Sequence, residues 1–152
     1  MIRRGSLLLL LGGLAACGPR QQRWLEFPIP REAEALTVRQ LPQGEGEQCD
    51  FRVERPYPYD GVHEFYRDSV REPWRRCPAS QERWEAVGAG TRRQRSSSWI
   101  DEGKQRYFVV ASWYDGDGEQ RVMLRYIAVG DPREWSFLQA LCRGATPPLP
   151  ID

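Results

Sequence analysis

The chain has very little of two residue types that often mark reactive or basic sites. Among its 152 residues it has one histidine, His63, and one lysine, Lys104. Because histidine supplies most general-base chemistry near neutral pH, a catalytic triad or Cys-His dyad would have to use His63. No G-x-S-x-G or comparable nucleophile motif accompanies this histidine. We therefore predict no catalytic residue, and we expect His63 to be exposed in the first turn of a helix.

Clustered metal ligands are missing as well, because the sequence contains no C-x-x-C pair. The acidic segment 115–119 (DGDGE) only superficially resembles a calcium loop. Its second glycine is at position 4, whereas a helical calcium loop needs glycine at position 6. A tight hairpin turn accounts for the same residues. We expect no metal and no other cofactor.

A large net charge of either sign is also absent. Lys and Arg number 22, Asp and Glu number 21, and the formal net charge is +1. A nearly neutral chain gives no argument for nucleic acid as a partner. The densest basic stretch, Arg92, Arg93 and Arg95, lies near Glu82 and Glu85. We interpret it as a solvated face in which the charges balance.

Long apolar runs are absent except at the N-terminus. Arg3 and Arg4 precede an apolar segment over 7–16, which is too short to span a membrane as a helix. The segment ends in Leu14-Ala15-Ala16-Cys17. A basic start, a short apolar stretch and a small-residue end are typical of an export signal.

The sequence Leu14-Ala15-Ala16-Cys17 resembles the lipobox of bacterial lipoproteins. The resemblance implies a signal peptide over 1–16, a lipidated Cys17 and membrane lipid as a partner. Gly18 stands where an aspartate would favour retention at the inner membrane, so the resemblance favours the outer membrane, facing the periplasm. The alternative is an ordinary secretory signal in which the cysteine is incidental.

The remaining chain divides into three parts. After Cys17 we expect a tether over 17–31, whose stiff end is 27–30 (FPIP). Residues 18–31, fully extended, would span at most about 50 Å. We expect a single domain over 32–144 and a proline-rich, disordered tail over 145–152.

Three cysteines remain after Cys17, namely Cys49, Cys77 and Cys142. Exported chains form disulfides, and an odd number leaves one thiol unpaired. Three pairings are possible. We favour Cys49–Cys77, because both residues lie on predicted strands that flank one helix, and this leaves Cys142 as the free thiol.

The hydrophobic pattern predicts an α+β fold, an antiparallel sheet of about four to six strands with two main helices packed on it. One helix begins at Asp60 and stops before Pro73, and the other begins at the N-cap Asp131 and ends at Gly144. The segment over 81–87 is expected to form a helical turn. Strands are predicted over 35–41, 49–54, 74–77, 92–100, 106–114 and 120–129.

The strand predicted over 106–114 is apolar on both of its faces, which places it at the centre of the sheet. It is expected to be covered on both faces, or covered on one face and binding a partner on the other. Aromatic residues near the strand ends, Trp99, Trp113 and Tyr114, are the candidates for a binding surface.

From these features we expect a membrane-anchored, non-enzymatic accessory module of the cell envelope that binds an envelope protein. One alternative is an immunity lipoprotein that neutralises a toxin delivered to the periplasm. Another is an envelope hydrolase or a protein that binds a small ligand or metal. The last alternative requires His63 or the acidic turn to lie in a pocket beside other polar groups.

Overall fold

A computed structural model of the chain describes residues 22–42, 45–54, 60–78, 81–87 and 90–144, and only the backbone of 81–87 and 90–93. The predicted signal peptide, Cys17 and the predicted tail lie outside these residues. The strands are β1 (Arg23–Trp24), β2 (Phe27–Pro28), β3 (Ala33–Gln40), β4 (Gly46–Val53), β5 (Arg75–Arg76), β6 (Gln81–Val87), β7 (Gly90–Asp101), β8 (Arg106–Tyr114) and β9 (Gln120–Ala128), and the helices are α1 (Gly61–Ser69) and α2 (Pro132–Cys142).

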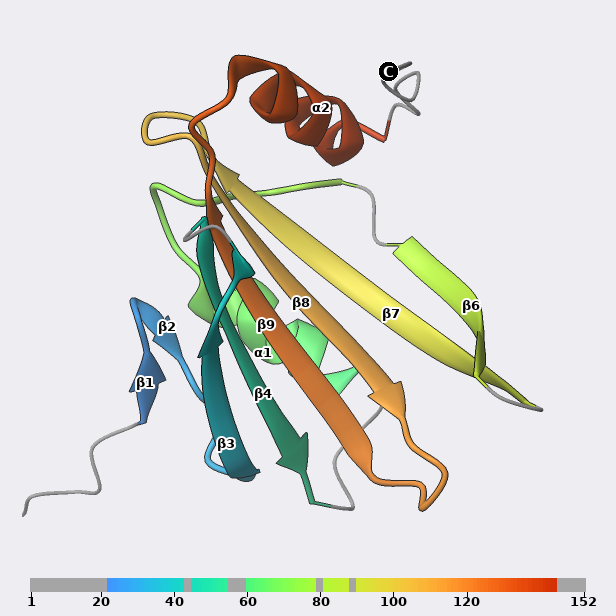
Figure 1. The fold of residues 1–152 in the computed structure, drawn as a ribbon. Coiled ribbons are helices and arrows are strands. Elements are labelled where there is room, and N and C mark those ends of the chain that lie inside the picture. Colours follow the sequence, from blue (N-terminus) through green and yellow to red (C-terminus); the bar gives the residue numbers. More distant parts are fainter. Residues whose placement is uncertain (1–21, 43–44, 55–59, 79–80, 88–89, 145–152) are drawn as a thin grey trace, which may run out of the picture.

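One antiparallel sheet dominates the fold (Figure 1). Its strand order is β3-β4-β9-β8-β7-β5, and β6 also pairs with β7, which makes seven strands. A separate two-stranded hairpin is formed by β1 and β2. The α+β class is confirmed, and the sheet has more strands than the four to six predicted.

The sheet has two unlike faces, which we name from the side chains of the central strand β8. The α1 face carries Phe108, Val110 and Ser112, and it is covered by α1 and the β1–β2 hairpin. The open face carries Val109, Ala111 and Trp113. Helix α2 covers the open face only at one end of the sheet (Figure 1).

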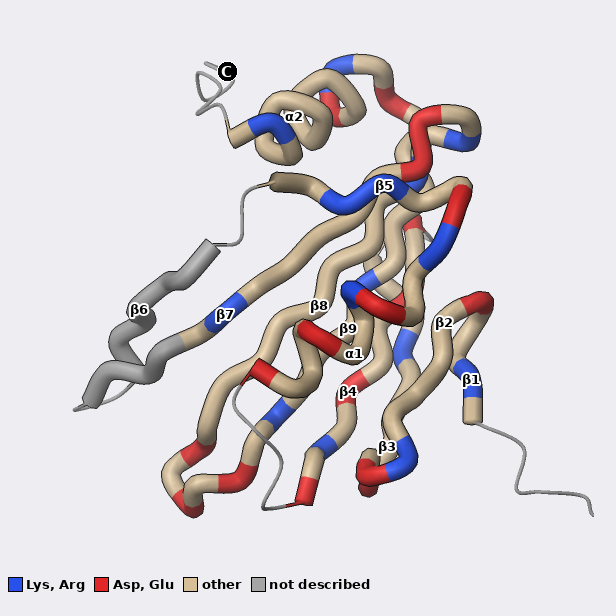
Figure 2. Tube along the Cα trace, turned by 180° about the vertical axis from the view of Figure 1, so that it is seen from behind, with Lys and Arg blue, Asp and Glu red and all other residues tan. Residues whose placement is uncertain are grey.

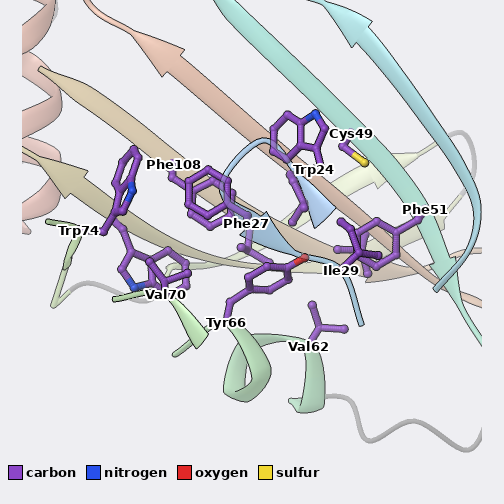
Figure 3. Packing of buried hydrophobic residues seen from close by; sticks show 14 of the residues in the cluster. Trp24, Phe27, Ile29, Cys49, Phe51, Val62, Tyr66, Val70, Trp74 and Phe108 are labelled. Atoms are coloured by element: carbon purple, nitrogen blue, oxygen red, sulfur yellow. The ribbon is translucent and has the colours of Figure 1, made fainter. Parts of the chain in front are cut away.

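The core on the α1 face is built from aromatic rings (Figure 3). The Phe27 ring stacks on the Phe108 ring, with their centroids 3.7 Å apart. Trp24 and Ile29, like Phe27, are almost completely buried. The predicted tether is therefore wrong for residues 23–30: their apolar side chains are part of the core, and burying them stabilises the domain.

Polar contacts hold the N-terminal hairpin in place. The Trp74 indole donates a hydrogen bond of 2.8 Å to the carboxylate of Glu26. Arg106 donates to the same oxygen over 3.0 Å, and its guanidinium lies 4.8 Å from the centre of the Trp74 ring. Hydrogen bonds and a cation–π contact thus join the hairpin to β8 and to the segment before β5.

Helix α2 begins as the sequence predicts. The carboxylate of Asp131 accepts a 2.7 Å hydrogen bond from the backbone N–H of Arg133, and Pro132 occupies the first turn. Trp135 and Leu138 are buried against the end of the sheet. Gly144 follows the helix with a φ of 79°, a conformation that glycine adopts without strain.

A disulfide joins Cys77 to Cys142 and so ties α2 to the residue that follows β5. The predicted Cys49–Cys77 pair and the predicted free thiol at Cys142 are therefore wrong. Cys49 is the unpaired cysteine among the described residues, and it is buried on the α1 face. Burial, together with the charge of Asp50, raises the pKa of Cys49 to about 11, so its thiol stays protonated at neutral pH.

The helical turn predicted over 81–87 is also wrong. These residues form β6, which runs antiparallel to β7 from the pair Gln81–Ser96 to the pair Val87–Gly90. The pairing with β7, which begins at Gly90, makes this segment a strand, and such pairing overrides a local helical pattern. The three strands predicted over 92–100, 106–114 and 120–129 are confirmed as β7, β8 and β9.

Replacing Gly46 with alanine should destabilise the fold by about 2 kcal/mol or more, because the new methyl group overpacks the β4–β9 contact. A Cβ atom at Gly46 would lie 1.9 Å from the carbonyl oxygen of Tyr126. Urea unfolding measures the change. Gly116→Ala is the matched control, because its Cβ would meet no atom within 4 Å. Equal unfolding midpoints for Gly46→Ala and wild type would contradict the close approach of the two strands.

Candidate binding face

The three aromatic residues predicted to form a surface lie in three different environments. Trp99 is only 1% exposed and contacts Phe108 in the core, so its prediction as a surface residue is wrong. Its strand position places it on the same face as Phe108. Tyr114 is 36% exposed, at the end of β8 on the α1 face. Trp113 is half-buried on the open face.

On the open face, the strand register aligns side chains in rows that cross five strands. We call one of them the Trp113 row: from β7 to β3 it contains Gln94, Trp113, Arg121, Arg52 and Glu34. The adjacent row, on the side of α2, has mostly smaller side chains: Ser96, Ala111, Met123, Asp50 and Thr37. The longer side chains of the Trp113 row extend farther from the sheet than those of the adjacent row. The surface of the sheet therefore has a step between the two rows.

A depression of about 400 Å³ lies at this step, above the strands β3, β4, β9 and β8. Trp113, Arg121 and Arg52 line it from the Trp113 row, and Asp50 and Thr37 line it from the adjacent row. The site is therefore an amphipathic hollow, lined by an indole ring and two guanidinium groups.

Ion pairs fix the two guanidinium groups. Arg52 lies 2.9 Å from a carboxylate oxygen of Glu119, and the Nε of Arg121 donates to Asp115 over 2.7 Å. Each arginine retains further N–H donors beyond these bonds. Because the side chains are already held in place, a partner that accepts hydrogen bonds from them would not have to order them.

The acidic turn between β8 and β9 supplies those carboxylates (Figure 2). Asp115 also accepts hydrogen bonds from the backbone N–H groups of Asp117 and Glu119, over 3.1 and 3.0 Å. The hydrogen bond from Arg121 leads the contributions that hold the pKa of Asp115 below its usual range. The hairpin-turn interpretation of this segment is therefore confirmed.

His63 is a second feature that sequence reasoning misplaced. It is only 2% exposed, enclosed between α1 and the sheet, so the expectation of an exposed residue is wrong. Its Nδ1 lies 2.9 Å from the hydroxyl of Ser97, and its Nε2 lies 2.8 Å from the hydroxyl of Ser112. Both ring nitrogens thus have partners, and the histidine joins α1 to β7 and β8.

The arginines of the open face could have been found from the sequence. In β9, Arg121, Met123 and Arg125 alternate with the buried residues Val122 and Leu124. This alternation indicates that one face of the strand is polar. The neighbours of these arginines in β3 and β4 depend on the register, which the pattern of a single strand does not reveal.

Within the described ranges, no group of three or more His, Cys, Asp or Glu side chains is placed to hold a metal ion. Neither α1 nor α2 has the length and apolar character that a membrane-spanning helix needs. The sequence matches no protein-family model and none of the curated proteins with which it was compared.

His63 should make the stability of the fold depend on pH. Burial, and secondarily the charge of Arg76, lowers its pKa from 6.5 to about 4. Between these two values the unfolded chain binds a proton that the folded chain does not. The free energy of unfolding should therefore be highest above pH 6.5 and fall by about 2 to 3 kcal/mol as the pH drops toward 4.

Urea unfolding at pH 7.5 and 4.5, with His63→Leu for comparison, isolates this effect from the titration of carboxylates that both proteins share. The variant should be less stable at pH 7.5, because two buried serine hydroxyls lose their partner. The difference between the two proteins should shrink at pH 4.5. A difference that does not change with pH would show that His63 does not titrate with a lowered pKa.

Proposed function

We propose that this protein is a lipid-anchored accessory module of the cell envelope, which binds an envelope protein through its open face and does not act as a catalyst. The observation that supports this best is the Trp113 row, where a half-buried tryptophan lies beside two arginines held by ion pairs. Tryptophan and arginine are the residues most enriched among those that dominate protein–protein binding energies.

The position of the N-terminal hairpin supports the same arrangement. Gln22 already belongs to the folded part, because its carbonyl oxygen accepts a 2.8 Å hydrogen bond from the backbone N–H of Ile29. The five residues from Cys17 to Gln21 would span at most about 18 Å. The hairpin lies on the α1 face, against Phe108. An anchor at Cys17 would hold the domain close to the membrane, and the α1 face would be turned toward the lipid. The open face would then point away from the membrane, toward a partner.

Anchoring can be tested with Cys17→Ser. This variant should move from the membrane fraction to the soluble fraction, because it loses the acyl chains that would hold the protein at the membrane. Fractionation followed by immunoblotting measures the change. Cys49→Ser is the matched control, and its fractionation should be unchanged because Cys49 is buried in the domain. Cys17→Ser protein that stays in the membrane fraction would contradict lipid anchoring.

Partner binding can be tested with Trp113→Ala and Tyr114→Ala, which remove neighbouring aromatic rings from opposite faces. Crosslinking in cells and purification from membranes should recover one defined protein with the wild type. Trp113→Ala should weaken binding about 30-fold, the effect of losing roughly 2 kcal/mol at a dominant interface residue. Tyr114→Ala should retain the partner. Equal recovery with both variants would exclude the open face as the binding surface.

A further inference from the structure

Strand β3 forms an outer edge of the sheet. In the part of the chain that the structure describes, β3 pairs with β4 on one side and with no strand on the other. Most of its residues are exposed, and Val38, at 55%, is the most exposed of the large apolar side chains described. A strand edge of this kind presents backbone N–H and C=O groups that can pair with another strand.

The sequence of β3 is self-complementary in the antiparallel direction. A bulge places Ala35 and Leu36 together opposite Phe51 of β4, so these two residues occupy one position in the ladder. If Ala35 and Leu36 are counted as one ladder position and β3 is paired antiparallel with β3 of a second copy, Thr37 lies opposite Thr37 of that copy. Two ladder positions away, on each side of this central pair, Glu34 of one copy lies opposite Arg39 of the other.

The faces of the sheet agree with this register. Leu36 and Val38, which would meet each other, both belong to the α1 face, where Leu36 packs against the core. Glu34 and Arg39 both belong to the open face, by their pairing with Arg52 and Gln48. The register thus places apolar residues opposite each other on one face and opposite charges on the other. Both kinds of cross-strand pair are stabilising.

The charged residues of β3 are available for such pairs. Arg39 lies 3.8 Å from Asp50, and its side chain is 67% exposed, so this ion pair is weak. Glu34 is exposed and forms no ion pair with any described residue. In the proposed register, each of the two would gain a partner without breaking a strong contact.

We propose that two copies of this chain pair antiparallel through β3, around a twofold axis at Thr37. The sheets of both copies would become continuous. The open faces would lie on the same side, and because Ala35 and Thr37 line the depression, the two depressions would be neighbours. Both lipid anchors would also point toward one membrane, a point that rests on the proposed function.

The expected dimer is weak in solution, since one strand pair buries less than the roughly 800 Å² per partner of a standard interface. Two anchored copies meet at a higher effective concentration on a membrane. The dimer should therefore be measured with the full anchored chain in membranes, and by sedimentation of the same chain in detergent.

The register can be tested by disulfide crosslinking with single cysteine substitutions in the anchored full chain. Thr37→Cys places two thiols on the twofold axis and should give a covalent dimer on a non-reducing gel. Gln40→Cys is the matched control on the same strand: its counterpart is Ala33, so the two new thiols would lie about 20 Å apart. Equal crosslinking of both variants, or none with Thr37→Cys, would overturn the proposal.

Exchanging the charges gives an independent test. Glu34→Arg or Arg39→Glu should each weaken the dimer about tenfold, because both charge pairs become repulsive. The double variant Glu34→Arg/Arg39→Glu should restore it, whereas a general loss of folding could not be rescued in this way. Failure of this rescue would overturn the register. Trp113→Ala should leave the crosslinking of Thr37→Cys intact, which separates failure of the dimer from failure of partner binding.

Discussion

The ring of Phe108 is the contact on which the rest of the structure depends. It lies on the central strand and stacks against Phe27 of the N-terminal hairpin. The rings of Tyr66 in α1, Trp74 before β5 and Trp99 in β7 also approach it, with centroid distances between 5.5 and 6.1 Å. Elements from most of the chain thus meet at one side chain, and this accounts for a well-packed α1 face in a small domain.

The open face has a different character because α2 is too short to cover it. An eleven-residue helix is about 16 Å long, and it lies across one end of a broad sheet. The uncovered part carries a network of arginines, carboxylates and amides, in which Arg125 bonds the buried Gln48 and Gln48 bonds Asp50. A well-packed face and a polar, solvent-facing face would both suit the anchored binding module proposed above.

Sequence patterns predicted the elements whose signals are local. The two apolar faces of β8 and the cap at Asp131 were readable, because alternation and capping depend on neighbouring residues. The partners of Cys77 and His63 were not, because they lie 34 or more residues away along the chain. The candidate face was found only at Trp113. Its arginines become one site only through the strand register, which a single sequence does not contain.

If the chain is exported as proposed, the disulfide between Cys77 and Cys142 has a consequence for the order in which its bonds can form. In a chain that crosses a membrane from its N-terminus, Cys49 and Cys77 arrive before Cys142, and with Cys17 lipidated each is for that interval the other's only possible internal partner. The native bond has to wait for Cys142. Early burial of Cys49 beneath the hairpin would withdraw its thiol from exchange. By burying Cys49, the N-terminal hairpin would then prevent a bond between Cys49 and Cys77 until Cys142 emerges.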